Sequence, residues 1–345
     1  MIDRCPICWS TNIVIGLGTV SGYTEGTEYG ISCCKQCNSQ FAQTNGKTDD
    51  SYNLIYSLAD TPGYARYHQY AKAIKKWRDP LRFLALHEAA YYPVYQYVKN
   101  REGLKILEIG CGYGYLSYSL KMRGFSVTGI DISSIAIDFA KRNFGDFFFN
   151  VGVGNLDEVL SAKYDLIIAT EVIEHLDDPG RIIGQMKGLL NPDGRILLTT
   201  PNKDYWNKTA LWQTDPPPVH LFWLGKKGII SLANRCSMQI EFVNFSHYYP
   251  RSENRLMKYI WSRKEPLCGP IMTREGKIHS KATEDKRGKF HRNLSVTLDK
   301  NSLVRNLSNF FFNLFNGSEI TLAVTMRVDL GRNSHELSDP GMVAN

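Results

Sequence analysis

The stretch "ILEIGCGYGYLS", residues 106–117, decides the fold. It starts as a short apolar run, and glycines at positions 110, 112 and 114 then precede a segment with helical spacing. Glycine lets the backbone turn sharply and lets a ligand approach closely, because it has no Cβ. The stretch therefore predicts a buried strand, a ligand-binding loop and a helix in succession.

Short apolar runs recur along the chain, separated by segments with helical spacing or by turns. Such runs suit strands that are buried on both faces of a sheet. They are "LKILEIG" (104–110), "FSVTGID" (125–131), "FFFNVGV" (147–153), "YDLIIAT" (164–170), "GRILLTT" (194–200), "MQIEFVNFSHY" (238–248) and "EITLAVTMRV" (319–328). The alternation predicts an α/β fold with a doubly wound, Rossmann-like parallel sheet, whose ligands bind at the carboxyl ends of the strands.

Two carboxylates accompany the glycine loop. Glu108 lies just before it, and Asp131 ends the second apolar run, 17 residues after Gly114. A carboxylate at the second position can accept hydrogen bonds from both hydroxyls of a ribose. A dinucleotide site is the main alternative, but its fingerprint is G-x-G-x-x-G, whereas this loop has G-x-G-x-G. Glu108 would also repel a diphosphate, whereas it suits a cofactor that carries an ammonium and a sulfonium.

With these residues the chain resembles class I S-adenosylmethionine-dependent methyltransferases of the type 11/23-like group, whose first motif is E-x-G-x-G-x-G followed by a ribose-binding acid. The resemblance implies a seven-stranded methyltransferase sheet and S-adenosylmethionine as the cofactor. Asp131 would hold the ribose, Ile132 would pack on the adenine, and Asn155 and Leu156 would flank its edge. The implied cofactor-binding residues are Glu108, Gly110, Cys111, Gly112, Gly114, Asp131, Ile132, Asn155, Leu156 and Thr170. For Asp131 the alternative is a helix N-cap before "ISSIAIDFAKR".

The stretch "EVIEHLDDPG", residues 171–180, follows another apolar run and contains Glu171, Glu174 and His175. At positions i, i+3 and i+4, these side chains would share one face of a helical turn and converge on a cation. A further histidine, His220, lies downstream in "DPPPVHLFW". The residues predict a polar cluster at the end of the fourth strand.

This set resembles the E-x-x-E-H motif and distal histidine of small-RNA 3′-end 2′-O-methyltransferases and of magnesium-dependent O-methyltransferases of ubiquinone biosynthesis. The resemblance implies that Glu171, Glu174, His175 and His220 are catalytic and bind a divalent ion, with Mg2+, Mn2+ and Zn2+ as candidates. The ion would chelate two adjacent acceptor hydroxyls and lower the pKa of the attacking one. Two alternatives need no ion: Glu171 and its neighbours shape the pocket floor, or His175 or His220 is a general base.

Five of the eight cysteines fall within the first 37 residues. Cys5 and Cys8 form one C-x-x-C pair and Cys34 and Cys37 another, joined by a Gly- and Thr-rich stretch that predicts a small β-ribbon. Tetrahedral zinc takes four such thiolates, and metal binding compensates for the small core of so short a segment. The spacing predicts a structural zinc site, with Cys33 as an alternative to Cys34. A group of buried cysteines without metal is the other interpretation.

The pattern along the chain predicts a division into segments. They are a zinc-binding module at 1–45, a helical connector or lid at 46–100, a methyltransferase domain at 101–330 with a basic insertion at 250–316, and a tail at 331–345. Between Arg251 and Arg292 there are twelve Lys or Arg against five Asp or Glu, and this difference of +7 equals the net charge of the whole chain. Such an excess either attracts an acidic partner or belongs to a solvated insertion.

Composition sets wider limits. With 345 residues, 43% of them hydrophobic, the chain is long enough for one large α/β domain with attachments. It contains no run of about 18 uncharged apolar residues, the length that a membrane span needs. The N-terminus "MIDRCPICWS" also lacks the pattern of a secretory signal. We therefore expect a protein without a membrane span in the cytoplasm, where its thiols stay reduced.

The order of cysteine module, Tyr-containing connector and methyltransferase core resembles bacterial methyltransferases from sugar-modification and natural-product pathways. The resemblance implies an enzyme that methylates a hydroxyl of a small molecule, sugar or glycan, including acidic or nucleotide-linked acceptors. One alternative is RNA 2′-O-methylation, favoured by the four candidate ligands and the basic insertion. Carbon methylation of a nucleotide-linked sugar is another, favoured by the N-terminal module. A non-enzymatic alternative is a scaffold that binds S-adenosylmethionine and recruits a partner through its zinc module. The intact glycine loop and Asp131 argue against it.

Overall fold

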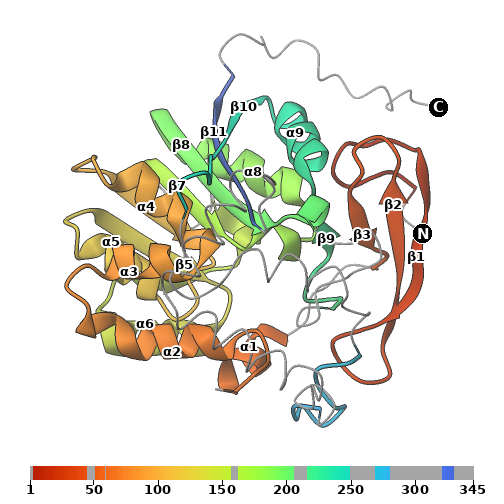
Figure 1. The fold of residues 1–345 in the computed structure, drawn as a ribbon, viewed down its shortest axis with the longest axis horizontal. Coiled ribbons are helices and arrows are strands. Elements are labelled where there is room, and N and C mark those ends of the chain that lie inside the picture. Colours follow the sequence, from red (N-terminus) through yellow and green to blue (C-terminus); the bar gives the residue numbers. More distant parts are fainter. Residues whose placement is uncertain are drawn as a thin grey trace.

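The computed structural model describes residues 3–44, 51–58, 60–156, 162–205, 216–248, 269–279 and 321–329. The predicted tail at 331–345 and most of the basic insertion at 250–316 lie outside these ranges. Within them the chain forms two sheets, one of four strands and one of seven (Figure 1). Among the described helices, none has the length and apolar character that crossing a membrane requires.

The seven-stranded sheet has the order β10-β11-β8-β7-β4-β5-β6. Its strands are β4 (Lys105–Ile109), β5 (Ser126–Asp131), β6 (Phe148–Asn150), β7 (Tyr164–Thr170), β8 (Leu190–Pro201), β10 (Met238–Phe242) and β11 (Thr321–Val328). The strands from β8 to β6 pair in parallel, whereas β11 lies antiparallel between β8 and β10. The structure confirms the α/β fold and the seven-stranded sheet, and each predicted apolar run supplies one strand. The prediction of a parallel sheet is wrong for β11, which runs antiparallel to both of its neighbours.

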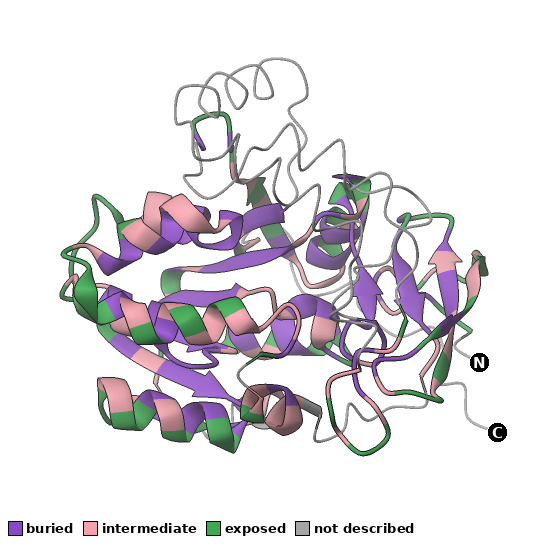
Figure 2. Cartoon of the chain, turned by 60° about the horizontal axis from the view of Figure 1, so that its bottom comes forward, coloured by how far each residue is buried: buried purple, intermediate pink, exposed green. Residues whose placement is uncertain are grey.

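Helices cover both faces of this sheet. They are α3 (Pro80–His87), α4 (Tyr92–Val98), α5 (Tyr115–Lys121), α6 (Ser134–Phe144), α8 (Pro179–Gly188) and α9 (Lys226–Arg235). Alternate side chains of a strand enter different cores: Leu166 and Ile168 pack with residues of α3, α4 and α5, whereas Ile167 packs with residues of α8 and α9. Figure 2 shows the buried strands in purple between helices whose outer faces are green. This burial on both faces explains the nearly continuous apolar runs.

The predicted connector is helical where the structure describes it. It contains α1 (Ser51–Ser57) and α2 (Ala65–Ala73), followed by α3 and α4. Pro80 and Pro93 each lie in the first turn of a helix, where the N–H that proline lacks has no intrahelical partner. Leu84 of α3 and Val94 of α4 are fully buried in the core on one face of the sheet. These two helices are therefore a layer of the main fold.

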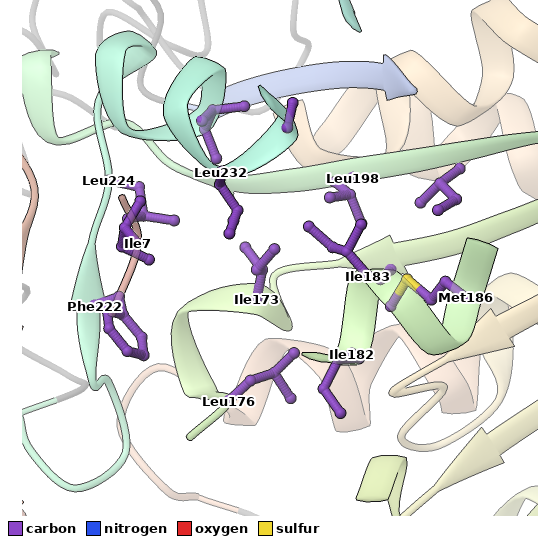
Figure 3. Packing of buried hydrophobic residues seen from close by; sticks show 14 of the residues in the cluster. Ile7, Ile173, Leu176, Ile182, Ile183, Met186, Leu198, Phe222, Leu224 and Leu232 are labelled. Carbon is purple, nitrogen blue, oxygen red and sulfur yellow. The ribbon is translucent and has the colours of Figure 1, made fainter. Parts of the chain in front are cut away.

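The N-terminal segment forms a second, antiparallel sheet. Its strands are β1 (Ile13–Ser21), β2 (Glu28–Cys34), β3 (Gln40–Ala42) and, from much later in the chain, β9 (Phe222–Trp223). Ile7 belongs to the same apolar core as Ile173 of the central domain and Leu232 of α9 (Figure 3). The predicted boundary at residue 45 therefore does not separate two independent cores.

Candidate functional site

A cavity of about 910 Å³ opens at the carboxyl ends of β4, β5 and β7. The glycine loop, Asp131, Thr170 and the "EVIEH" stretch line one side of it, and tyrosines of the connector line the other. Ligand sites in doubly wound sheets lie at this edge, so the position agrees with the expectation from the strand order. Two sets of polar residues line this cavity: the glycine loop with its acids, and the "EVIEH" stretch with His220.

The glycine loop needs glycine for reasons of space and of backbone conformation. Gly114 has φ of +78°, and a Cβ there would lie 2.6 Å from the ring of Phe148. Gly112 has φ of +49°, and its Cβ would lie 2.8 Å from the hydroxyl of Tyr56 in α1. Both are left-handed conformations that side chains disfavour. Helix α1 thus lies over the loop, and Tyr113 Oη donates a 2.9 Å hydrogen bond to the Tyr56 carbonyl.

Asp131 organises the loop through both carboxylate oxygens. The backbone N–H of Gly112 donates to Oδ2 at 2.8 Å, and the N–H of Ser133 donates to Oδ1 at 2.8 Å. The N-cap of α6 is Ser133, whose hydroxyl accepts from the N–H of Ala136. The alternative in which Asp131 is only a helix N-cap is therefore wrong. Each oxygen retains a lone pair that can accept a hydroxyl donor from the cavity.

Glu108 lies under the loop and is 2% exposed. Its carboxylate accepts a hydrogen bond from the Ser117 hydroxyl of α5. Burial raises the pKa of Glu108 to about 8, and the hydrogen bond from Ser117 partly opposes this. Burial also raises the pKa of Asp131, against the backbone N–H groups that favour its charged form. Two acids with raised pKa values at the edge of one cavity are a pattern typical of functional sites.

The remaining predicted cofactor residues differ in their positions. Cys111, Ile132 and Thr170 line the cavity, and burial raises the pKa of Cys111. Leu156 is fully buried in the apolar core and does not line the cavity, so its predicted contact with adenine is not supported. Residues 151 to 154 form the wall there. Asn155 ends a 3₁₀ turn, and its side chain lies outside the described part of the structure.

Glu174, His175 and His220 form a compact cluster at the same edge. One candidate ligand atom from each lies within 4.8 Å of those of the other two. The imidazole centroids of the two histidines are 4.5 Å apart. Glu174 is 1% exposed and His220 is 4% exposed, and both line the cavity. One carboxylate and two imidazoles at this spacing are a donor set that a divalent ion accepts.

The backbone fixes the orientation of this cluster. His175 Nδ1–H donates to the carbonyl of Val219 at 2.6 Å, which leaves Nε2 with a lone pair. The N–H of Leu221 donates to the carbonyl of Glu174 at 2.8 Å, so the segment around His220 is held against the motif. Burial and the neighbouring His175 hold the pKa of His220 well below its usual value. Within the described ranges, the buried Nδ1 of His220 has no hydrogen-bond partner.

Glu171 is placed differently from the prediction. The motif forms a single 3₁₀ turn over Ile173–His175, and Glu171 precedes that turn with φ of +54°. It lines the cavity but is outside the group of ligand atoms within 4.8 Å. The expectation of one helical face carrying Glu171, Glu174 and His175 is therefore wrong. The left-handed residue turns the chain between β7 and the 3₁₀ turn.

Some lining residues carried no sequence prediction as site residues. Tyr113 and Tyr115 follow the loop glycines, and Arg181 lies in the first turn of α8, after the histidine motif. The connector adds Tyr52, Tyr56, Tyr64, Tyr67, Tyr70 and Tyr91. The sequence signal for them was the abundance of tyrosine in the connector, and aromatic helices of this kind are more often packing surfaces than lids.

Four cysteine sulfurs converge in the N-terminal sheet. Cys5 and Cys37 are 3.7 Å apart at Sγ, Cys8 and Cys34 are 3.5 Å apart, and all four sulfurs lie within 4.8 Å of one another. A Zn–S bond of about 2.3 Å gives tetrahedral edges of about 3.8 Å, so the residues fit zinc. The hydrogen bond from Cys5 lowers the pKa of Cys37 to about 5, which favours a thiolate there. Cys33 is outside the group.

Comparisons with known proteins agree on one kind of domain. Residues 67–260 match a family described as "Methyltransferase domain". The ubiquinone biosynthesis O-methyltransferase of Pasteurella multocida is 31% identical over 153 residues, which cover 39% of this chain and 63% of that protein. The protein of the same name from Coxiella burnetii is 34% identical over 108 residues, covering 30% of this chain and 46% of the relative. The matched segments thus span less than two thirds of these relatives.

Solved structures with a similar trace include two methyltransferases. The plantazolicin methyltransferase BamL is 14% identical with a TM-score of 0.43, and the match covers 81% of this chain and 97% of that one. The magnesium protoporphyrin IX methyltransferase of Synechocystis PCC 6803 is 19% identical with a TM-score of 0.37, covering 58% of this chain and 92% of that one.

Proposed function

The chain belongs to the methyltransferase domain family, and on that premise we propose that it is an S-adenosylmethionine-dependent methyltransferase that acts on a hydroxyl of a small-molecule acceptor. One observation carries the proposal: Glu174, His175 and His220 form a ligand-spaced cluster that lines the same cavity as the glycine loop and Asp131. A nucleophilic hydroxyl must lose a proton during methyl transfer, and this cluster is the polar group suited to remove it.

The donor is proposed to occupy the crevice between the glycine loop and Asp131. The free lone pairs of Asp131 would accept both ribose hydroxyls, and Ile132, which is 58% exposed, offers an apolar surface to the adenine. The carboxylate of Glu108 would balance the positive charge of the donor. Alignment of hydroxyl oxygen, methyl carbon and sulfur would then supply most of the rate.

In the proposed reaction, an oxygen lone pair of the acceptor forms the new bond to the methyl carbon. The carbon–sulfur bond breaks, and its electron pair stays on the sulfur, which becomes neutral. The hydroxyl proton leaves to a base in the cluster. In the reaction without an ion, His175 is suited to this step, because its Nδ1–H is held by Val219 and its Nε2 keeps a lone pair.

We also propose that this cluster binds a divalent metal ion. Glu174, His175 and His220 would hold it, and the unpartnered, buried Nδ1 of His220 within the described ranges is the observation that favours such a ligand. With an ion bound, Nε2 of His175 would be a ligand and not the base, and the ion would lower the pKa of a coordinated hydroxyl enough for its proton to leave to water. Glu171 is proposed to shape the wall next to this site, because it lies outside the cluster.

The acceptor is proposed to be a small molecule with adjacent hydroxyls, sugars included. Relatives named for O-methylation support oxygen as the methylated atom. The aromatic lining contributed by the connector suits a ring-shaped acceptor. Most of the basic insertion lies outside the described residues, so no described contact favours RNA over a small molecule.

The test uses a radiolabelled methyl donor with catechol and methyl glucoside as probes. We expect transfer to at least one probe, sensitive to EDTA and restored by Mg2+ or Mn2+. Glu174→Gln should abolish transfer while the affinity for S-adenosylhomocysteine, measured by calorimetry, stays within about twofold. Transfer that persists in Glu174→Gln and in His175→Ala would overturn the role of the cluster. If EDTA does not reduce transfer but those two variants abolish it, the cluster acts as a base and the proposal of a divalent ion is wrong.

A further inference from the structure

We propose that the N-terminal cysteine module is a positioning element of the active site, which holds Glu174 and His220 in register through β3 and β9. The inference rests on the proposed function for the roles of those two residues. The sequence predicted a fold-stabilising zinc site or a recruiting module, and neither assigns the module a part in the reaction. The structure links it to the cluster by an unbroken path.

The path starts at the second cysteine knuckle. The N–H of Cys34 donates to the carbonyl of Ser39 at 2.9 Å and closes the turn that carries Cys37. The strand β3 begins one residue later, at Gln40. Because the turn is short, the positions of the two sulfurs and the start of β3 are fixed together.

From β3 the path crosses to β9. Gln40 pairs with Trp223, and Phe41 pairs with Phe222, in antiparallel register. The N–H of Ala42 then donates to the carbonyl of Leu221 at 2.9 Å. The strand β9 has two residues and is too short to be stable without a neighbour, so its pairing with β3 determines its position.

Leu221 connects the module to the cluster. Its carbonyl accepts from Ala42, while its own N–H donates to the carbonyl of Glu174 at 2.8 Å. The neighbouring Val219 carbonyl accepts from His175 Nδ1 at 2.6 Å. His220 lies between these two anchored residues, so movement of β9 would displace it relative to Glu174 and His175.

Packing supports the same path. Ile7 of the first knuckle belongs to the same apolar core as Phe222, Leu224 and Ile173 (Figure 3). Arg235 of α9 donates to the carbonyl of Pro6, and its other nitrogen contacts Asp178 Oδ1 at 3.1 Å. Arg235 thereby attaches the first knuckle to α9 and to Asp178, the N-cap of α8. The first knuckle also shares a core with β9 through Ile7, in addition to the link through β3.

The cysteines supply the cross-link that makes this path rigid. Cys5 and Cys34 are fully buried and Cys37 is 1% exposed, and their sulfurs meet from knuckles about 30 residues apart in sequence. Without a shared metal ion, thiols so close together repel when ionised and hold only weak hydrogen bonds. We therefore expect zinc loss to loosen β3 and, through it, Leu221 and His220.

The test compares hydrogen exchange in holoprotein and zinc-stripped protein, by mass spectrometry of the peptide covering 216–224. Cys37→Ser is the variant and Cys33→Ser the matched control, because Cys33 lies in the same strand region outside the sulfur cluster. We expect exchange of the Leu221 amide to become at least tenfold faster in Cys37→Ser and in stripped wild type. The peptides covering 105–109 and 126–131 should be unchanged, and added zinc should restore the stripped wild type.

Kinetics with the donor distinguish positioning from general damage. The kcat should fall at least tenfold in Cys37→Ser, whereas the Kd for S-adenosylhomocysteine should stay within about twofold. Ala42→Pro, which removes the N–H that reaches Leu221, should retain zinc and give the same loss of protection. If Cys37→Ser does not fold, hydrogen exchange and kinetics of the zinc-stripped wild type and of Ala42→Pro test the proposal instead.

Unchanged protection of Leu221 after zinc removal would overturn the proposal, and so would purified protein without stoichiometric zinc. The exchange experiment needs no acceptor. If the wild type transferred methyl to no probe but lost protection on stripping, the proposed function would fail while the mechanical link held. If transfer were normal in stripped protein, the positioning role would fail while the proposed function held.

Discussion

Replacing Glu108 with Gln should change how the stability of the donor-free protein depends on pH. Burial raises the pKa of Glu108 from 4.5 to about 8. Between these values the folded protein keeps a proton on the carboxyl, whereas the unfolded chain releases it. Because the folded state binds more protons in this window, the free energy of unfolding of the wild type should fall as pH rises from 4.5 to about 8.

The magnitude follows from the two pKa values. The interval from 4.5 to about 8, converted at about 1.4 kcal/mol per pH unit, amounts to about 5 kcal/mol at pH 9. This is an upper limit, because rearrangement or water entry around an ionised Glu108 would reduce it. It is comparable to the whole stability of many domains, which is about 5 to 15 kcal/mol. The Gln variant keeps an acceptor for the Ser117 hydroxyl and has no charge to bury.

The assay is urea unfolding from pH 5 to pH 9 for the wild type, Glu108→Gln and the control Glu241→Gln, whose parent residue is exposed on β10. We expect the wild type and Glu108→Gln to be nearly equal at pH 5 and the Gln variant to be more stable at pH 9. Glu241→Gln should follow the wild type throughout. S-adenosylmethionine should reduce the difference in unfolding free energy between Glu108→Gln and the wild type at pH 9, because its positive charge favours the ionised carboxylate of Glu108. Identical pH dependence in the wild type and Glu108→Gln would refute the reasoning.

Three further substitutions have defined outcomes. Asp131→Asn replaces one acceptor oxygen by an amide nitrogen, and calorimetry with S-adenosylhomocysteine should give an affinity lower by about 10- to 100-fold, since a hydrogen bond to a charged group is worth about 1.5 to 3 kcal/mol. His220→Ala should lower the rate of methyl transfer by about 100-fold or more with donor affinity unchanged, whereas the exposed His247→Ala should transfer methyl normally. Gly114→Ala places a Cβ 2.6 Å from the ring of Phe148 at φ of +78°, and thermal unfolding should show a loss of about 2 to 5 kcal/mol. Wild-type affinity for S-adenosylhomocysteine in Asp131→Asn would contradict the first prediction. A wild-type transfer rate in His220→Ala would contradict the second, and wild-type thermal unfolding of Gly114→Ala would contradict the third.

The parts of the fold that depend on local pattern were predictable from the sequence. Apolar runs predicted each strand of the seven-stranded sheet, because strands buried on both faces need apolar residues at successive positions. The spacing of Gly110, Gly112 and Gly114 predicted the loop, since each has a positive φ. The position of Asp131 beside that loop followed from the parallel order of the first two strands.

Features that depend on distant contacts were not predictable. Phe222 and Trp223 form a strand only because β3 lies beside them, and two residues carry no periodic signal. Leu156 was assigned to the cavity by resemblance, yet it follows a 3₁₀ turn and is buried in the core. Glu171 adopts φ of +54°, which no rule for glutamate anticipates, and this removes it from the cluster.

The place of β11 in the sheet has a consequence for synthesis of the protein. Residues 321–328 fill the gap between β8 and β10, and Thr321 follows the end of β8 at Pro201 by 120 positions (Figure 1). At about 5 to 20 residues per second, a ribosome needs roughly 6 to 24 seconds to make that interval. Meanwhile the backbone of β8 next to Ile196 and Leu198 is an open apolar edge that other nascent chains can join. The yield of native protein in a cell should therefore depend on chaperone capacity during those seconds.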